Sequence, residues 1–194
     1  IYNISYSKGF RSPSISELYL KHITTYGLIV AGNPELTPED VNSYEISIKN
    51  ATYNNISWNT ALFYNIYNNM IDFVYNVPTL AMNHNTKVVA KGFELEMNLF
   101  SSNKINMNIN YSYLDMNDLD DKPILYRSQH KGKILINFLT DFININLSAQ
   151  GQSKQYYEDF LEDFDYDNGF PIKTLSGQII SECSFSKSID NNKI

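Results

Sequence analysis

The sequence predicts an all-β fold, an antiparallel transmembrane β-barrel segment of about eight strands. Two observations support this prediction. Apolar and polar residues alternate with period two through most of the chain, which is the pattern of strands with two different faces. The connections between these segments alternate between long and short. Antiparallel strands joined in this way carry all their long loops at one end, as outer-membrane barrels do.

The alternating segments are clearest where asparagine or glutamate occupies every second position. In INMNINYSY the apolar residues Ile105, Met107 and Ile109 alternate with asparagines, and GFELEMNLF repeats the pattern with Glu94 and Glu96. The segments predicted as strands are 2–7, 41–50, 56–68, 92–100, 105–113, 133–138, 142–150 and, more weakly, 174–186. The segments 41–50, 92–100, 105–113 and 142–150 have the roughly 9 to 11 residues that a tilted membrane-crossing strand needs.

Short links follow the second, fourth and sixth strands, as NATYNN, SSNK and TD. Long connections follow the other strands, at about 9–40, 69–87, 116–131 and 153–173. The first contains three prolines, and Gly9 is expected to release the chain from the strand ladder at its start. A structureless loop of this length is uncommon in a compact soluble domain. It is ordinary at the loop end of a membrane barrel.

A soluble β-sandwich or an extracellular β-domain would also contain alternating strands. Repeated asparagines along a dry core would leave amides unpaired, at about 1–3 kcal/mol each, whereas a water-filled lumen accepts them. The barrel interpretation therefore divides the side chains between lipid and lumen. Lipid-facing side chains are predicted for Tyr44, Ile46, Ile48, Phe93, Leu95, Ile105, Met107, Ile109, Ile143 and Ile145, and lumen-facing ones for Glu45, Glu94, Glu96, Asn108 and Asn146.

Composition excludes several classes of function. The chain has a net charge of −6, which argues against the basic stripe that a nucleic-acid-binding protein needs. One cysteine and three histidines cannot form a disulfide framework or a His/Cys zinc site. The longest aliphatic run, at 28–31, is far too short for a spanning helix. No nucleophile elbow, phosphate loop or paired-histidine motif is present. We therefore expect neither an enzyme nor a bound cofactor or metal.

Two motifs in the first long connection resemble those of the TonB-dependent outer-membrane receptors. GFRSP supplies Gly9, Phe10, Arg11 and Pro13, in the place of a GFRAP-like motif, with Ser12 replacing the more usual alanine. GNPELTPED supplies Asn33, Pro34, Leu36, Pro38 and Glu39, and Glu45 follows at the acidic position of the next strand. Farther along, KGFELEMNL and NYSYLDMNDLDDKPILYRSQHKG are similar to the next strand pairs of these receptors, with Gly92, Glu94 and Pro123 in matching places.

The resemblance implies a barrel of about 22 strands with a plugged lumen. It also implies import of an iron–siderophore complex, haem or cobalamin across the outer membrane of a Gram-negative bacterium, driven through contact with the TonB complex. Residues 1–194 would then be a partial barrel domain, because eight strands are well short of that number. The plug, the TonB box, the early strands and the final strands are expected outside this segment.

Three candidate ligand contacts lie in the first long connection. Haem receptors of this family carry a haem-ligating histidine between the same two motifs, and His22 falls in that interval. An imidazole on an exposed loop suits axial ligation of haem iron, although a solvated loop histidine is the simpler interpretation. Tyr26 lies beside it. Arg11 is either a tie to the carboxylate of a neighbouring loop, which we favour, or a ligand contact.

A second group of candidates lies in the third long connection, where Tyr126, Arg127, His130 and Lys131 form an aromatic and basic stretch. Catecholate siderophore complexes are flat anions, which aromatic rings and guanidinium groups are suited to bind. The alternative is an aromatic girdle at the membrane interface. The acidic run 156–169 departs from a calcium-binding loop in the position of Gly169, so a solvated acidic loop is favoured over a divalent-ion site.

The sequence therefore leads to one main hypothesis, a receptor for TonB-coupled import of an iron–siderophore complex. A haem or cobalamin receptor is the alternative within the same family. A passive porin or a surface-binding β-barrel is the alternative from another class. A plug domain and a TonB box encoded upstream would support the receptor, whereas further alternating strands alone would contradict it.

Overall fold

The computed structural model describes residues 1–25, 27–53, 55–74, 79–83, 87–102, 104–118, 124–140, 142–159 and 171–187. Its main feature is one eight-stranded antiparallel sheet in the order β1-β4-β5-β8-β9-β10-β11-β14. The bounds of these strands are β1 Tyr2–Arg11, β4 Glu39–Tyr53, β5 Ile56–Asn68, β8 Val88–Ser102, β9 Ile105–Asp118, β10 His130–Leu139, β11 Asn144–Gln152 and β14 Gln178–Ser186. The predicted all-β, antiparallel architecture is confirmed.

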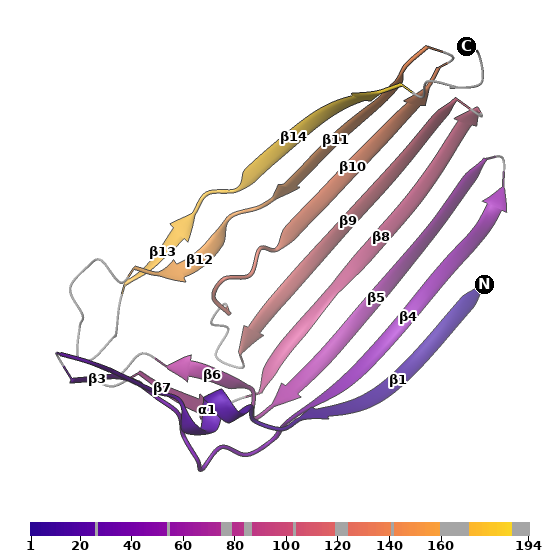
Figure 1. The fold of residues 1–194 in the computed structure, drawn as a ribbon. Helices are drawn as coiled ribbons and strands as arrows, with labels where there is room; N and C mark the ends of the chain where they lie inside the picture. The colour runs from indigo at the N-terminus through magenta and orange to yellow at the C-terminus, as the bar shows by residue number, and fades with distance from the viewer. Residues whose placement is uncertain are drawn as a thin grey trace, which may run out of the picture.

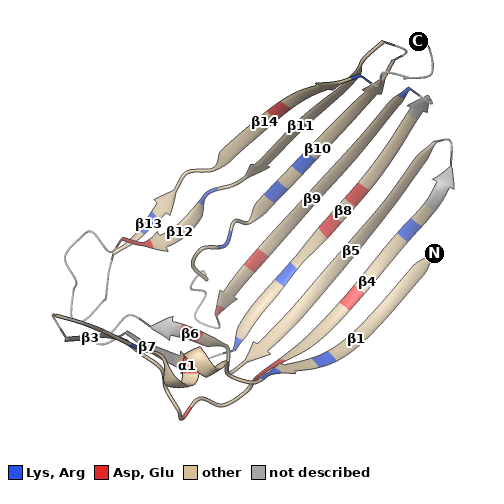
Figure 2. Ribbon diagram, viewed as in Figure 1, with Lys and Arg blue, Asp and Glu red and all other residues tan. Residues whose placement is uncertain are grey.

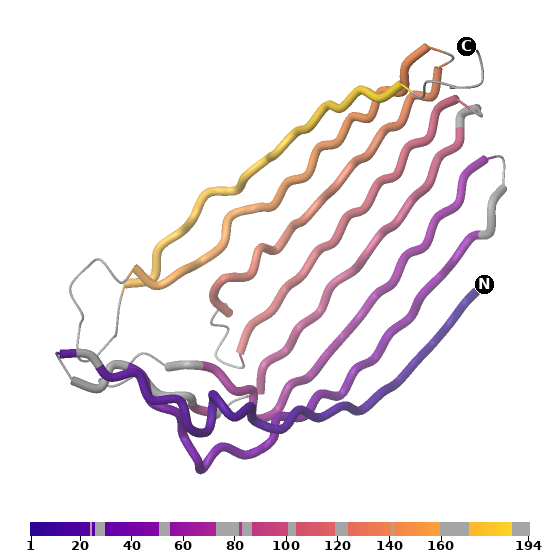
Figure 3. The backbone as a smooth tube through the Cα atoms, in the orientation of Figure 1, coloured from indigo at the N-terminus to yellow at the C-terminus, as the bar shows by residue number. Residues whose placement is uncertain are grey.

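The sheet is a single curved layer whose neighbouring strands are consecutive crossings of the chain (Figure 1). All of the long connections gather at one end, which we call the loop end, and the tight turns lie at the other (Figure 3). The strands extend farther toward the loop end than the alternation indicated. β9 continues to Asp118, and β10 begins at His130.

The predicted division into two faces is borne out by the strand register. Across β4, β5 and β8 the aligned residues Ile46, Leu62 and Phe93 share one face, which continues to Tyr113 on β9. We call this the apolar face, and the opposite one the polar face. Glu94 aligns with Ser112 and Lys131 on the polar face. Of the predicted residues, Ile143 alone precedes its strand, β11, so the register does not assign it to a face.

The apolar face is bare. Ile4, Ile46 and Leu62 are 79%, 50% and 59% exposed, and no second layer covers them in the described part of the chain (Figure 1). A soluble sandwich would bury such side chains against another sheet. A face of this kind is stable when lipid covers it.

The first long loop, residues 12–38, is more ordered than the sequence indicated. It holds the helix α1 Ile15–Tyr19 and the strands β2 Lys21–Thr24 and β3 Gly27–Ala31. The prediction that Gly9 releases the chain from the ladder is wrong. Gly9 pairs with Val41, and the ladder continues to the pair Arg11 and Glu39. Val41 would leave room even for a Cβ at position 9, so the crowding that the prediction assumed is absent.

The second long loop, residues 69–87, supplies β6 Ile71–Val74 and β7 Thr79–Asn83. These strands join the first loop in a four-stranded sheet of order β2-β3-β7-β6, in which β3 and β7 run parallel. Leu36 of the first loop and Ile71 at the start of β6 form a buried cluster, and Leu18 of α1 packs against it. The two loops therefore share a small core of their own.

The fourth long connection holds a separate two-stranded hairpin, β12 Gln155–Glu158 and β13 Ile172–Leu175. The final sheet strand, predicted from residue 174, begins at Gln178 because 172–175 belongs to this hairpin. None of the described helical residues makes a helix of the length and apolarity needed to cross a bilayer.

The register generates a test of orientation. Ile109→Arg places a charge on the apolar face and should cost about 2–4 kcal/mol of stability near the bilayer midplane. Asn108→Arg places the charge on the polar face and should cost much less. It removes amide hydrogen bonds with Asn98 and Asn110 that water can replace. The measurement is urea-induced unfolding of the full-length protein in lipid vesicles.

Spin labels provide an independent check of the same register. A label at position 109 should be quenched by oxygen dissolved in lipid, and a label at position 108 by a water-soluble reagent. The reverse accessibility would show that the faces are assigned one residue out of register.

Candidate functional site

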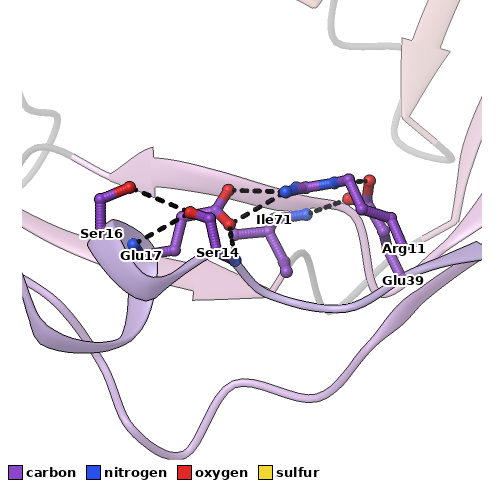
Figure 4. Close-up of polar contacts among 6 residues, drawn as sticks. All are labelled: Arg11, Ser14, Ser16, Glu17, Glu39 and Ile71. Atoms are coloured by element: carbon purple, nitrogen blue, oxygen red, sulfur yellow. Dashed lines mark hydrogen bonds and ion pairs between the residues drawn. The ribbon is translucent and has the colours of Figure 1, made fainter.

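Four residues form a polar clamp where the sheet ends and the loops begin: Arg11, Glu17, Glu39 and Ile71 (Figure 4). Arg11 Nε donates to Glu39 Oε1 at 2.5 Å, and Arg11 Nη1 donates to both carboxylate oxygens of Glu17 at 3.0 and 2.9 Å. Glu39 Oε2 accepts the backbone N–H of Ile71 at 2.9 Å. The arginine thus ties β1 to α1 and to β4, as the favoured interpretation of Arg11 predicted. Its role as a ligand contact stays a prediction.

Local sequence explains why α1 forms beside the arginine. Ser14 and Glu17 make a capping box: Ser14 Oγ accepts from Glu17 N at 3.2 Å, and Ser14 N donates to Glu17 Oε2 at 2.6 Å. This arrangement satisfies N–H groups at the helix start that have no partner within the helix. Glu17 therefore both caps α1 and binds Arg11. The placement of Pro13 just before the N-cap suits a helix start, because proline lacks the N–H that would need a partner.

The second motif closes the loop back on α1. Gly32 N donates to Leu20 O at 2.6 Å, and Asn33 N donates to Glu17 O at 2.8 Å. A Cβ on Gly32 would meet the backbone of Leu18 and Tyr19 at 2.5 Å, so glycine is required for this approach. Asn33 Oδ1 accepts Glu35 N at 2.9 Å and fixes the turn at Pro34. In this structure the motif residues shape the loop.

Gly92 of β8 has a comparable steric role within the main sheet. A Cβ at this position would collide with the carbonyl oxygen of Tyr113 and would lie 2.8 Å from the Phe63 ring. Glu45, the acidic position after the second motif, aligns with Ser5 and Phe63 on the polar face. Phe10 lies on β1 and is 80% exposed, and Pro38 directly precedes β4.

A second group of side chains, the basic–aromatic cluster, consists of Tyr126, Arg127, Lys154 and Tyr156. The backbone N–H of Tyr126 donates to Tyr156 O at 2.8 Å, which joins the third long connection to β12. Lys154 Nζ lies 5.7 Å from the centre of the Tyr156 ring. Tyr126 and Arg127 are exposed. The third and fourth long connections therefore meet through the backbones of Tyr126 and Tyr156, with Arg127 next to one of these residues and Lys154 over the ring of the other.

Sequence reasoning found Tyr126 and Arg127 but missed Lys154 and Tyr156. The available signal was the KQYY stretch that opens the fourth long connection. The acidic residues that follow this stretch led to an interpretation in terms of carboxylates instead. Of that run, residues 160–170 lie outside the described residues. In the described part, no group of three histidine, cysteine, aspartate or glutamate side chains is arranged to hold a metal ion.

His130 and Lys131, the other two residues of the predicted aromatic and basic stretch, belong to β10 and lie on opposite faces of the main sheet. As the first residue of β10, His130 aligns with Tyr113 on the apolar face. Its Nδ1 lies 2.7 Å from Tyr111 Oη, and its ring centre lies 5.1 Å from that of Tyr113. Lys131, the next residue, points to the polar face by the same alternation. The surroundings of His130 are those of an aromatic girdle at a membrane interface, and its ligand role stays a prediction.

His22 lies on β2, is exposed and pairs with Val30. Its neighbour in the prediction, Tyr26, lies outside the described residues. On β12, burial raises the pKa of the Glu158 carboxyl, and the negative charge of Asp72 on β6 raises it further.

The polar face contains a hollow of about 580 Å³. Its charged lining consists of Glu94 and Glu96 on β8 and Lys131 and Lys133 on β10, with Asn110 of β9 between them. The register aligns Glu94 with Ser112 and Lys131, and Glu96 with Asn110 and Lys133. Figure 2 shows the acidic and basic positions on strands separated by β9. The prediction that the two glutamates share a polar face is confirmed.

The clamp generates a pH prediction. The hydrogen bond from Arg11, aided by the Ser14 cap, lowers the pKa of the Glu17 carboxyl from 4.5 to about 2, against the opposing effect of burial. A lowered pKa in the folded state stabilises the fold above the ordinary value. That stabilisation is lost as the pH falls from about 4.5 to about 2.

A spin label on α1 at position 19 should therefore become mobile in this pH range in the full-length protein. In Glu17→Gln the label should be mobile at every pH, because neither the charge nor its titration remains. A wild-type spectrum that does not change with pH would contradict the assignment of this interaction to the clamp.

Comparison with known proteins places these features in a family. The family model described as TonB dependent receptor-like, beta-barrel matches residues 3–178. A curated relative is the vitamin B12 transporter BtuB of Photobacterium profundum, which is 24% identical over 155 residues. That match covers 76% of this chain and 24% of the transporter.

Solved structures show the same fold. The copper transporter OprC matches with a TM-score of 0.74 at 10% identity, over 98% of this chain and 29% of that protein. The ferric enterobactin receptor PfeA of Pseudomonas aeruginosa, in complex with enterobactin, matches with a TM-score of 0.72 at 14% identity, over 98% and 31%. The chain thus spans less than a third of the length of each of these proteins. The family match over most of the chain shows that it belongs to the TonB-dependent receptors and forms part of their β-barrel.

Proposed function

We propose that this chain is part of an outer-membrane receptor that imports an iron–siderophore complex with energy supplied through the TonB complex. The observation that carries this proposal is the basic–aromatic cluster at the loop end. Arg127 and Lys154 supply positive charge, and Tyr126 and Tyr156 supply ring faces. A ferric catecholate complex combines negative charge with flat aromatic groups, so both of its properties have a partner there.

The remaining surfaces support the same role. The bare apolar face suits contact with lipid, and the polar face suits the wall of a water-filled lumen. The long loops lie at one end of the sheet, where an external ligand would first meet the receptor (Figure 3). Contact with TonB would be made by a region of the full receptor outside residues 1–194. The proposed cellular location is the outer membrane of a Gram-negative bacterium, where this family resides.

Haem is the second candidate ligand, and His22 is the observation that favours it. Its imidazole is exposed on a loop strand between the two motifs, where it could reach an open coordination position of haem iron. The matched proteins are named for vitamin B12, copper and enterobactin. These names differ in chemistry and do not select one ligand, so the choice depends on the residues of this chain.

Substitution in the full receptor separates the two ligands. If a catecholate complex is imported, Arg127→Ala and Lys154→Ala should each weaken binding of ferric enterobactin roughly fivefold, through loss of one cation near an anion. His22→Ala should be nearly neutral, because a hexadentate chelate leaves iron no open position. Binding is measured by quenching of intrinsic fluorescence.

If haem is imported, His22→Ala should abolish growth on haem as the sole iron source, and the cluster variants should have little effect. Lys21→Ala is the matched control, because it removes one exposed cation from a different loop. Uptake of every iron source at the wild-type level in all of these variants would contradict both proposals.

A further inference from the structure

Glu39 uses its two carboxylate oxygens for two different parts of the receptor. Oε1 accepts from Arg11 at 2.5 Å, across the last pair of the β1–β4 ladder. Oε2 accepts from the backbone N–H of Ile71 at 2.9 Å, at the start of β6 in the second long loop. The side chain of Glu39 is 18% exposed, so little water competes for either oxygen. One carboxylate therefore joins the rim of the sheet to the second loop.

The first and second long loops are also joined to each other away from the rim. Val30 and Ala31 of β3 align with Thr79 and Leu80 of β7 in a parallel pair. Ile71 is buried against Leu36, and Leu18 packs beside them. The two loops thus form one body, which includes the strand that carries His22. Figure 4 shows this body meeting the rim at the hydrogen bonds of Arg11 and Glu39.

We propose that Glu39 is a positioning residue that fixes the body formed by the first and second long loops over the rim of the sheet, as one wall of the ligand site at the loop end. The inference rests on the proposed function in one respect, that the ligand is bound at the loop end. Glu39 need not touch the ligand. Its role is to hold the start of β6 in the second loop in a fixed position relative to the last pair of the β1–β4 ladder.

Donor and acceptor chemistry makes the role specific to glutamate. Arg11 Nε and Ile71 N are both donors, so position 39 must supply two acceptors. Glutamine has the same shape but only one acceptor oxygen, and its amide N–H₂ would face one of the two donors. Aspartate keeps both acceptors and the charge but is one methylene shorter. Both substitutions should therefore release one side of the connection.

Glu17→Gln is the matched control for Glu39→Gln. Each substitution removes one negative charge beside Arg11, so each changes the electrostatic attraction for a charged ligand in a similar way. The Glu17 carboxylate binds Arg11 and the start of α1, so it makes no bond to the second loop among these contacts. The Glu39 carboxylate binds Arg11 and also the second loop, through Ile71 N. A difference between the variants therefore reports the connection to the second loop.

The experiment measures distances between spin labels in the full receptor, in lipid vesicles without ligand. One label is placed at Tyr6 on β1, and the other at Met82 on β7 of the second loop; both side chains are exposed. We expect a narrow distance distribution in the wild type and in Glu17→Gln, and a broadened one in Glu39→Gln and Glu39→Asp. A distribution in the Glu39 variants as narrow as in the wild type would overturn the proposal.

Uptake kinetics test the consequence for the ligand, with ferric enterobactin as the probe. In Glu39→Gln the loops should be misplaced, which should raise KM roughly tenfold and leave the maximal rate unchanged. The factor of ten corresponds to the free energy of one lost hydrogen bond to a charged group. Broadened distances with an unaltered KM would overturn the claim that this body forms one wall of the ligand site. Failure of the wild type to take up the probe would contradict the proposed function, while the distance measurement would still decide the role of Glu39.

Discussion

The structure depends on one constraint: every strand must satisfy its backbone hydrogen bonds within the sheet while its side chains meet two different environments. Period-two alternation achieves this because each residue reverses the face of the one before it. Rows such as Ile46, Leu62 and Phe93 are then aligned by the ladder alone. On the other face, asparagines bind one another, as Asn98, Asn108 and Asn110 do. Neither face needs a second protein layer if lipid covers one and water fills the other.

The same constraint locates the clamp. Where the ladder ends, backbone groups lose their partners in the sheet, and side chains must take over. Arg11 and Glu39 are the last pair of the β1–β4 ladder, and their side chains continue the pairing into α1 and β6. An ion pair of this kind on an exposed surface would contribute little. Here the two carboxylates are only 14% and 18% exposed, so each oxygen has a fixed partner that water replaces poorly.

Most of the main sheet could be predicted from the sequence because its strands are long enough for the alternation to be unambiguous. The loop strands could not. β2 and β6 have four residues each, too few to show a period, and β3 finds its partner β7 in a different long loop. The face on which His130 lies also required the fold. Proximity in sequence grouped His130 with Arg127, but its position as the first residue of β10 turns its ring to the apolar face. The sequence identified Glu39 as part of a motif, but its hydrogen bond with Ile71 N could be found only from the folded structure.

The two charged rows on the polar face bear on where a ligand is selected. Glu94 and Glu96 lie on one side of the hollow, and Lys131 and Lys133 lie on the other. A small anion attracted by the lysines would be repelled by the glutamates, and a small cation attracted by the glutamates would be repelled by the lysines. This wall therefore favours neither anions nor cations strongly. At the loop end, Arg127 contacts the carbonyl oxygen of Tyr126 and Lys154 contacts the ring of Tyr156, whereas the two lysines of the wall share their hollow with glutamates. Discrimination by charge is therefore expected to occur at the loop end, before a ligand reaches the wall. If the chain takes part in uptake as proposed, the geometry of the loops, and not the composition of the sheet, should determine which compound is selected.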